Sequence, residues 1–174
     1  MRKTFIATLA ITIVLVFANS GMAQNQRGPS TQEERETAVK VARVLETEPF
    51  HKDAKKMREW LLLFLIGVPD IHVELCTAYM PHEKYTDKNY GSEIFNQTMF
   101  SSAAFVIEHP DQANDRVAAH LAGLEGALKV YETILATKPK AKSAFYDGLL
   151  EKRSKGELRA FVEEATTTQC KSKA

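Results

Sequence analysis

The sequence predicts an all-α fold, a single-domain antiparallel bundle of six or seven helices that one disulfide can clamp. Three observations support this prediction. Apolar residues recur at steps of three and four over most of the chain, as in amphipathic helices. Proline or glycine ends most of these periodic segments. The one stretch that alternates like a strand, residues 70–76, has no second strand to pair with, and a lone strand would leave its backbone groups unpaired.

Residues 1–23 are predicted to be a secretory signal peptide. A short basic start precedes an uncharged, mostly apolar run over residues 5–18, and small residues lead to a natural cleavage point after Ala23. The alternative is an uncleaved membrane anchor, but a run of about 14 residues is shorter than the roughly 20 that a helix needs to cross a bilayer. We therefore expect an exported protein, periplasmic or secreted, that does not span a membrane after signal removal.

The rest of the chain is nearly neutral. The full sequence has 23 basic and 22 acidic residues, and removing the signal takes away two basic residues and no acidic one, which leaves a net charge of about −1. A nucleic-acid partner would need a basic surplus or stripe, so we expect none. Residues 24–30 are polar and are expected to form a flexible tether, and residues 31–174 are long enough for one bundle domain with its own core.

The first helix is predicted to follow the tether directly. Ser30 with Glu33, or Thr31 with Glu34, can form a capping box at its start. Pro49 ends the segment. Between these limits the apolar residues repeat at helical spacing: Ala38, Val41, Ala42 and Leu45.

A second helix is predicted from Lys52 to Ile66. Its middle, WLLLFLI at residues 60–66, is apolar on every side, which is typical of a central helix that is buried all round. Seven apolar residues also fit a buried strand. We favour the helix, because the preceding AKKMREW is rich in helix formers and because Gly67 and Pro69 form a stop. The apolar positions at helical spacing are Met57, Leu61, Phe64 and Val68.

The next stretch, DIHVELCTAYM at residues 70–80, fits both a strand and a helix. Ile71, Val73 and Leu75 alternate as in a strand, whereas Asp70 as a cap, followed by apolar or aromatic residues four apart, fits a helix. We favour the helix, because nothing else in the chain resembles a second strand. Residues 81–91 then form the longest polar connection.

Two long helices are predicted after this connection. Ser92 opens the first, which runs to His109, and its centre at residues 101–104 holds four small residues that allow a neighbouring helix to approach closely. The second begins after Asp115 and follows an a/d pattern typical of antiparallel packing in a bundle. The residues of this seam are Val117, Leu121, Leu124, Leu128, Tyr131 and Leu135.

Two short helices complete the predicted bundle. Pro139 ends the long seam helix, and Phe145 with Leu149 marks the next segment. The last helix is predicted to be capped by Ser154 with Glu157. Its apolar residues are Leu158, Phe161 and Ala165.

One local stretch resembles a known repeat. GALKVYETILATKPKAK resembles the second helix of a tetratricopeptide repeat, with Ala127, an aromatic residue at Tyr131, an aliphatic residue at Ile134 and Pro139 at the end. The segment before it departs from that pattern, because Asp115 stands where a small residue is expected. No second copy occurs 34 residues away, and repeat arrays need about three copies for stability. The whole chain is therefore assigned to no family.

The chain has two cysteines, Cys76 and Cys170. In an exported protein an even pair of cysteines usually forms a disulfide. This bond would close a loop of about 95 residues, for which the chain-entropy model gives roughly 4–5 kcal/mol of stabilisation. It would also fix the C-terminal TTTQCKSKA to the middle of the bundle.

His72, Glu74 and Cys76 suggest metal or thiol chemistry, but weakly. On a strand the three share one side, whereas on a helix His72 and Cys76 share a face and Glu74 points away. Their spacing matches none of the usual zinc signatures, and a nucleophilic cysteine would need a free thiolate with a base beside it. The common catalytic motifs are absent as well. We predict no cofactor and lean against an enzyme.

The polar connection offers a candidate partner-binding loop, because it combines tyrosines with basic groups. Tyrosine supplies a large contact area at a small cost in side-chain entropy. The candidate residues are Tyr79, His82, Lys84, Tyr85, Lys88 and Tyr90.

The sequence therefore favours a non-catalytic binding or interaction module, or a structural component of the cell envelope. Its partner would be an unidentified protein or small ligand. Two alternatives stay open. One is a small periplasmic metal-binding protein or enzyme that uses His72, Glu74 and Cys76. The other is a carrier of an apolar small ligand, held between helices near residues 60–66.

Overall fold

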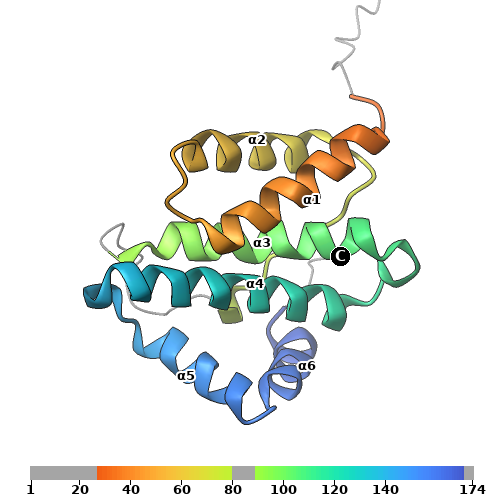
Figure 1. Cartoon of the computed structure of the whole chain (residues 1–174). Helices are drawn as coiled ribbons and strands as arrows, with labels where there is room; N and C mark the ends of the chain where they lie inside the picture. The colour runs from red at the N-terminus through yellow and green to blue at the C-terminus, as the bar shows by residue number, and fades with distance from the viewer. Residues whose placement is uncertain (1–26, 80–88, 171–174) are drawn as a thin grey trace, which may run out of the picture.

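A computed structural model describes residues 27–79 and 89–170, and all regular structure within them is helical (Figure 1). The predicted all-α bundle is confirmed, with six α-helices in these ranges. They are α1 (Gln32–Thr47), α2 (Ala54–Gly67), α3 (Gly91–Glu108), α4 (Arg116–Thr137), α5 (Ala144–Ser154) and α6 (Leu158–Thr168). Three short 3₁₀ turns accompany them: η1 (Thr77–Tyr79), η3 (Pro110–Gln112) and η4 (Pro139–Ala141). None of the helices described is long and apolar enough to cross a membrane.

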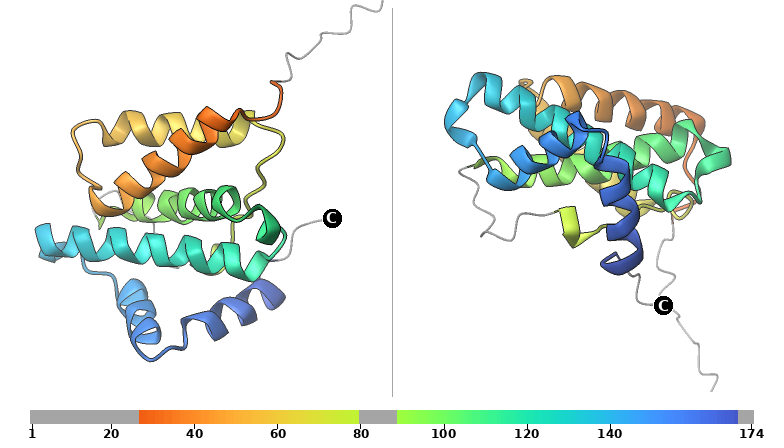
Figure 2. Two further views of the ribbon diagram at one scale, coloured as in Figure 1. Left: turned by 45° about the vertical axis from the view of Figure 1, so that its right-hand side comes forward. Right: turned by 90° about the horizontal axis from the view of Figure 1, so that it is seen from below.

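The helices lie in three tiers, which can be followed in Figures 1 and 2. α1 and α2 form one outer tier, α3 and α4 the middle tier, and α5 and α6 the other outer tier. One apolar cluster joins α1 and α2 to α3, and a second joins α4 to α5, α6 and η1. α3 and α4 are therefore the central helices of the bundle.

Small residues let α3 and α4 pack closely, as predicted for residues 101–104, all four of which are buried. On α4, a Cβ atom at Gly123 would lie 2.5 Å from the carbonyl oxygen of Thr98. A Cβ atom at Gly126 would overlap the hydroxyl of Ser101 and would lie 2.9 Å from Glu46 Oε1. Only glycine leaves room for this contact between the two backbones.

The predicted apolar seam of α4 is confirmed, because all of its side chains are buried or half-buried against the cluster shared with α5 and α6. Tyr131 also fixes the start of α5. Its hydroxyl donates to Asp147 Oδ1 at 2.8 Å and accepts a hydrogen bond from the backbone N–H of Ser143 at 2.8 Å. Burial raises the pKa of Tyr131 to about 12.

The prediction of a central position for residues 60–66 is wrong, although the helix itself is confirmed. α2 packs on α1 and α3 along one side only and lies at the edge of the molecule (Figure 1). Leu61 and Phe64 are buried on that side, whereas Leu63 is 70 % exposed and Ile66 is 74 % exposed. The middle of the bundle is taken by α3 and α4, because their small residues permit a closer approach than the large side chains of α2 do.

The helix favoured over residues 70–80 is also wrong for its first part. Residues 71–76 form neither helix nor strand, and only η1 is helical. Asp70 caps no helix, because it accepts hydrogen bonds from Ser30 N (2.8 Å), Ser30 Oγ (2.7 Å) and Arg35 Nη2 (2.6 Å). Burial of the Asp70 carboxylate opposes its ionisation, but these hydrogen bonds outweigh that effect and lower the pKa to about 2.

Two residues of the predicted tether contact the domain. Ser30 is bound to Asp70, and the Arg27 guanidinium lies 5.4 Å from the centre of the Phe64 ring, whereas the residues between them are exposed. The flexibility of residues 24–30 stays a prediction. Residues 24–26 and the predicted signal peptide at 1–23 lie outside the described residues.

One of the two predicted capping boxes is present. Thr31 is the N-cap of α1: its side chain accepts from the backbone N–H of Glu34, and the Glu34 carboxylate accepts from the backbone N–H of Thr31. The box predicted for Ser154 and Glu157 is wrong. Ser154 is the last residue of α5, and its hydroxyl donates to the carbonyl of Glu151 at 2.7 Å. It is therefore not available to cap α6.

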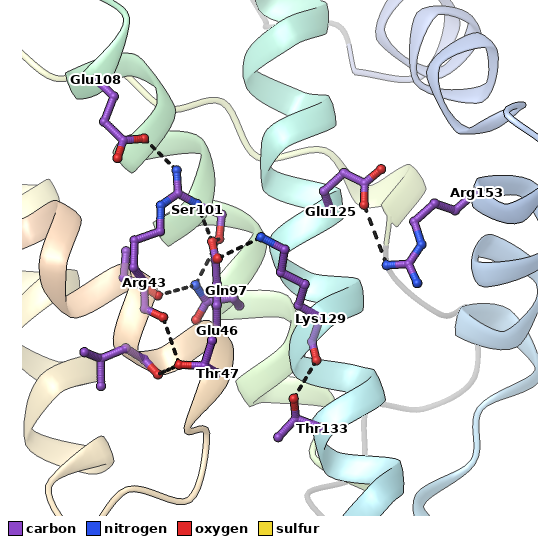
Figure 3. A network of polar contacts seen from close by, with 12 residues as sticks. Arg43, Glu46, Thr47, Gln97, Ser101, Glu108, Glu125, Lys129, Thr133 and Arg153 are labelled. Carbon is purple, nitrogen blue, oxygen red and sulfur yellow. Dashed lines mark hydrogen bonds and ion pairs between the residues drawn. The ribbon is translucent and has the colours of Figure 1, made fainter.

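A buried carboxylate ties α1 to both central helices (Figure 3). Glu46 is only 2 % exposed and accepts from Arg43 at 2.6 Å, from the Ser101 hydroxyl at 2.8 Å and from Lys129 at 3.3 Å. Gln97 extends the network, because its amide donates to Ser101 Oγ at 2.9 Å. Every partner of this buried charge is thus supplied from within the bundle, which is what a structural ion network requires.

Candidate binding surface

The two cysteines are joined in a disulfide, as predicted. The Cα atoms of Cys76 and Cys170 lie 4.9 Å apart, and the residues are separated by 94 positions in the chain. Both are buried. The bond fixes the end of α6 to the segment that precedes η1. Cys76 therefore offers no free thiolate, either as a metal ligand or as a nucleophile.

His72, Glu74 and Cys76 do not converge on one point. The Glu74 carboxylate forms an ion pair with Arg116, with 2.7 Å between Arg116 Nη2 and Glu74 Oε2. Partial burial would raise the pKa of Glu74, but the Arg116 guanidinium outweighs this effect and lowers the pKa below its ordinary value. Residues 27–79 and 89–170 contain no group of three or more side chains that could hold a metal ion.

His72 and Glu74 instead line a small pocket of about 250 Å³ at the start of α4. Its other walls include Val73, Arg116 and His120. His120 is 3 % exposed, and its ring packs edge-on against Tyr79 with 5.4 Å between the ring centres. The sequence does not single out His120, because this residue lies within a helix whose apolar spacing is regular.

The electrostatics of His120 are set by burial. Nε2 lies 3.5 Å from Glu74 Oε2 and forms no hydrogen bond with any group in the described part of the chain. Burial lowers the pKa of His120, and the nearby Glu74 carboxylate opposes this effect without cancelling it. His120 is therefore a neutral imidazole near pH 7, held against a carboxylate that Arg116 already neutralises.

Two members of the candidate partner-binding loop are described. Tyr79 is only 1 % exposed and lies in the core, where burial raises its pKa to about 12, so it cannot face a partner. Tyr90 is half-buried, has a left-handed backbone with φ of 57°, and packs edge-on against Phe50 at 5.3 Å. The remaining members lie outside the described residues: His82, Lys84, Tyr85 and Lys88.

Large apolar side chains are exposed on one side of α2, the side turned away from α1 and α3. We call it the outer face of α2, and it consists of Trp60, Leu62, Leu63 and Ile66. Lys55 and Lys56 are exposed one turn earlier in the same helix. Sequence reasoning identified this run but assigned it to the core, because periodicity alone does not show which side of a helix the neighbours occupy.

The described chain begins near the C-terminal end of α2 (Figure 1). Arg27 lines a shallow groove together with Trp60, Leu63 and Phe64, and it pairs with Glu34 of α1 at the edge of that groove. Arg27 also lies beside Gly67, because a Cβ atom placed on Gly67 would be 3.5 Å from a side-chain carbon of Arg27. The segment that precedes Arg27 is thus joined to the domain at the C-terminal end of α2.

Comparisons with protein-family models, curated proteins and solved structures give no match to this chain.

The two candidate regions differ in what they can do chemically. The pocket beside His120 is small, and its main charges already pair with each other. The outer face of α2 offers large apolar side chains that stay exposed in the described bundle, and burying such side chains against a partner is favourable. It is therefore the better candidate for a functional contact.

Proposed function

We propose that this protein is an exported, non-catalytic binding module whose contact surface is the outer face of α2. The observation that carries the proposal is the exposure of Leu63 (70 %) and Ile66 (74 %) on a helix whose opposite side is fully packed. Single exposed apolar side chains are common, whereas several on one side of a helix favour an interaction site.

Two features support export. Residues 1–23 have the basic, apolar and small-residue parts of a secretory signal. The Cys76–Cys170 bond belongs to proteins that work in an oxidising compartment, such as the periplasm or the cell exterior. Each feature is independent of the other, and both favour the same location.

Observations on the residues concerned weigh against the two alternative functions. A metal or thiol site at His72, Glu74 and Cys76 lacks a free cysteine, and its carboxylate is bound to Arg116. A carrier of an apolar ligand was suggested by residues 60–66, whose large side chains point outward in part rather than into an internal cavity. A contact surface on α2, in contrast, requires these side chains to be exposed, as they are.

Site-specific photo-cross-linking tests the proposal. A photo-reactive phenylalanine analogue is placed at position 63 of the full chain, which the producing cell exports with its own signal. The matched control carries the same group at Leu75, which is 56 % exposed but lies outside the outer face. We expect an adduct at position 63 and none at position 75, and the adduct mass identifies the class of partner. Equal adducts at both positions, or none at position 63, would refute the proposed contact surface.

A further inference from the structure

The outer face of α2 has the composition of a helix that lies on a bilayer surface. Such helices present Trp, Phe or Leu beside Lys or Arg. Tryptophan is favoured at the membrane–water boundary because its ring is apolar and its N–H is polar. Trp60 is fixed in place by a parallel stack on Phe64, with 5.3 Å between the ring centres and 6° between the planes.

Basic side chains adjoin the apolar ones in the same helix. Lys55 and Lys56 are exposed, and Lys55 lies 3.8 Å from Glu59 in a solvated pair. A lysine at the edge of an apolar surface can lay its methylene groups on acyl chains and keep its ammonium group among lipid phosphates.

The place where the chain enters the domain points to the same partner. Residues 5–18 are the apolar run of the predicted signal, and residues 19–26 join this run to Arg27. Eight residues span at most about 29 Å when fully extended. Arg27 is packed on Phe64 beside the outer face. Until the predicted signal is cleaved after Ala23, residues 5–18 would therefore hold the outer face of α2 within reach of the bilayer, and after cleavage the face itself would have to supply the contact.

From these observations we propose that the outer face of α2 lies against the surface of a lipid bilayer, with Leu63 and Ile66 at the boundary of the acyl chains. This inference rests on the proposed function, because it names the partner of the same face. The contact is peripheral: helices of this kind sink roughly 5–10 Å into the boundary between headgroups and acyl chains. A second copy of the chain and a different protein are the competing occupants.

Trp60 provides a direct test, because it is the only tryptophan in the chain. Its fluorescence is measured in the full chain with vesicles of phosphatidylcholine, alone or mixed with phosphatidylglycerol, and with vesicles whose acyl chains are brominated. The reporter lies on α2, and the variants described next leave residues 5–18 unchanged, so they separate contact through α2 from binding through that run. We expect the emission to shift to shorter wavelength with vesicles and to be quenched by the brominated chains.

Matched variants locate the contact. Leu63→Ser with Ile66→Ser is expected to abolish the quenching by brominated lipid, whereas Leu75→Ser is expected to leave it unchanged. Circular dichroism confirms that each variant is folded, as exposed positions allow. Emission that vesicles leave unchanged overturns the bilayer proposal, and so does quenching that persists in the double variant.

The two proposals can fail separately. A protein adduct at position 63, combined with no lipid quenching of Trp60, refutes the bilayer and leaves the binding module in place. An adduct with the mass of a second chain, together with emission that depends on protein concentration, identifies self-association instead. Absence of both an adduct and lipid quenching refutes the bilayer and the contact surface together.

Discussion

α2 and α4 are both rich in large apolar residues, yet they occupy opposite kinds of position. α4 lies in the middle tier, and its Leu124, Leu128 and Tyr131 are fully buried. α2 has the denser apolar run of the two, but Leu63 and Ile66 face outward. Apolar content therefore does not decide which helix becomes central.

The difference lies in the small residues. Gly123 and Gly126 let the backbone of α4 approach α3 at distances that a Cβ atom would forbid. Close approach buries both sides of each central helix, whereas the large side chains of α2 keep it on one side of the bundle. Leu63 and Ile66, which α2 leaves outward, remain mostly exposed in the described domain, and this makes them candidates for a contact.

Removing the disulfide should have the largest effect, because it is the covalent clamp on the tier farthest from α2. The double variant Cys76→Ser with Cys170→Ser is expected to lose about 4–5 kcal/mol of unfolding free energy, given a loop of 94 positions. Urea unfolding of the oxidised protein and of the variant measures this loss. Reductant should lower the stability of the wild type to that of the variant and leave the variant unchanged. Equal stability without reductant would argue against the clamp.

Two neighbouring leucines of α2 compare its two sides within one helix. Leu61 is 1 % exposed and Leu63 is 70 % exposed. Leu61→Ala is expected to cost about 2–5 kcal/mol, because it leaves a cavity in the cluster shared with α1 and α3. Leu63→Ala is expected to change stability by less than about 0.5 kcal/mol. Thermal unfolding of the two variants side by side tests this, and similar losses would show that α2 is buried on both sides.

Two glycines compare a closely packed helix position with an open one. Gly126→Ala is expected to destabilise the fold by about 1–3 kcal/mol, because the added methyl group overlaps Ser101 and crowds Glu46. Gly148 of α5 has open space around its Cβ position. Gly148→Ala is expected to stabilise the protein by about 0.5–1 kcal/mol through helix propensity. Opposite signs in denaturant unfolding support close packing of α3 and α4, and a neutral Gly126→Ala would contradict it.

Sequence patterns were sufficient for the helices but not for their neighbours. Periodicity identified each α-helix, and the seam of α4 and the small residues at 101–104 both indicated close packing. Periodicity is a property of one helix, so it could not show that the side of α2 carrying Leu63 has no neighbour. The non-helical conformation of residues 71–76 was missed for a related reason. Asp70 and Cys76, at the two ends of this stretch, are held by Ser30 and Cys170, contacts far away in sequence that override local preference.

The site residues likewise differ in whether the sequence could predict them. The pairing of Cys76 with Cys170 was predictable because the chain has no other cysteine. His120 was not, because its burial depends on Tyr79, which lies in a segment from elsewhere in the chain. The sequence contains the apolar run that carries the outer face of α2, but only the positions of the other helices show that this face is exposed.

His120 of α4 is buried, but its Nε2 atom forms no hydrogen bond in the described part of the chain. Replacing His120 should have the smallest effect on stability. Burial lowers its pKa in the folded state below the ordinary value of about 6.5. The unfolded chain then binds more protons as the pH falls below about 6.5, so stability is full above this pH and declines below it until the folded-state pKa is passed. One such group changes the unfolding free energy by at most about 1.4 kcal/mol per pH unit.

Unfolding free energies measured between about pH 4.5 and pH 7 should isolate this contribution. Asp70 and Glu74 also have lowered pKa values, but a carboxylate loses its stabilising effect only as the pH falls through a lower range. His120→Gln should therefore flatten the slope in this window, whereas Asp70→Asn should leave it in place and act below it. An unchanged slope in His120→Gln would mean that the pKa of His120 is the same in the folded and unfolded states, whereas a steeper slope would mean that His120 carries its proton inside the fold, paired with Glu74. The imidazole would then be a satisfied partner of that carboxylate, in the same way that Lys129 is a partner of the buried Glu46.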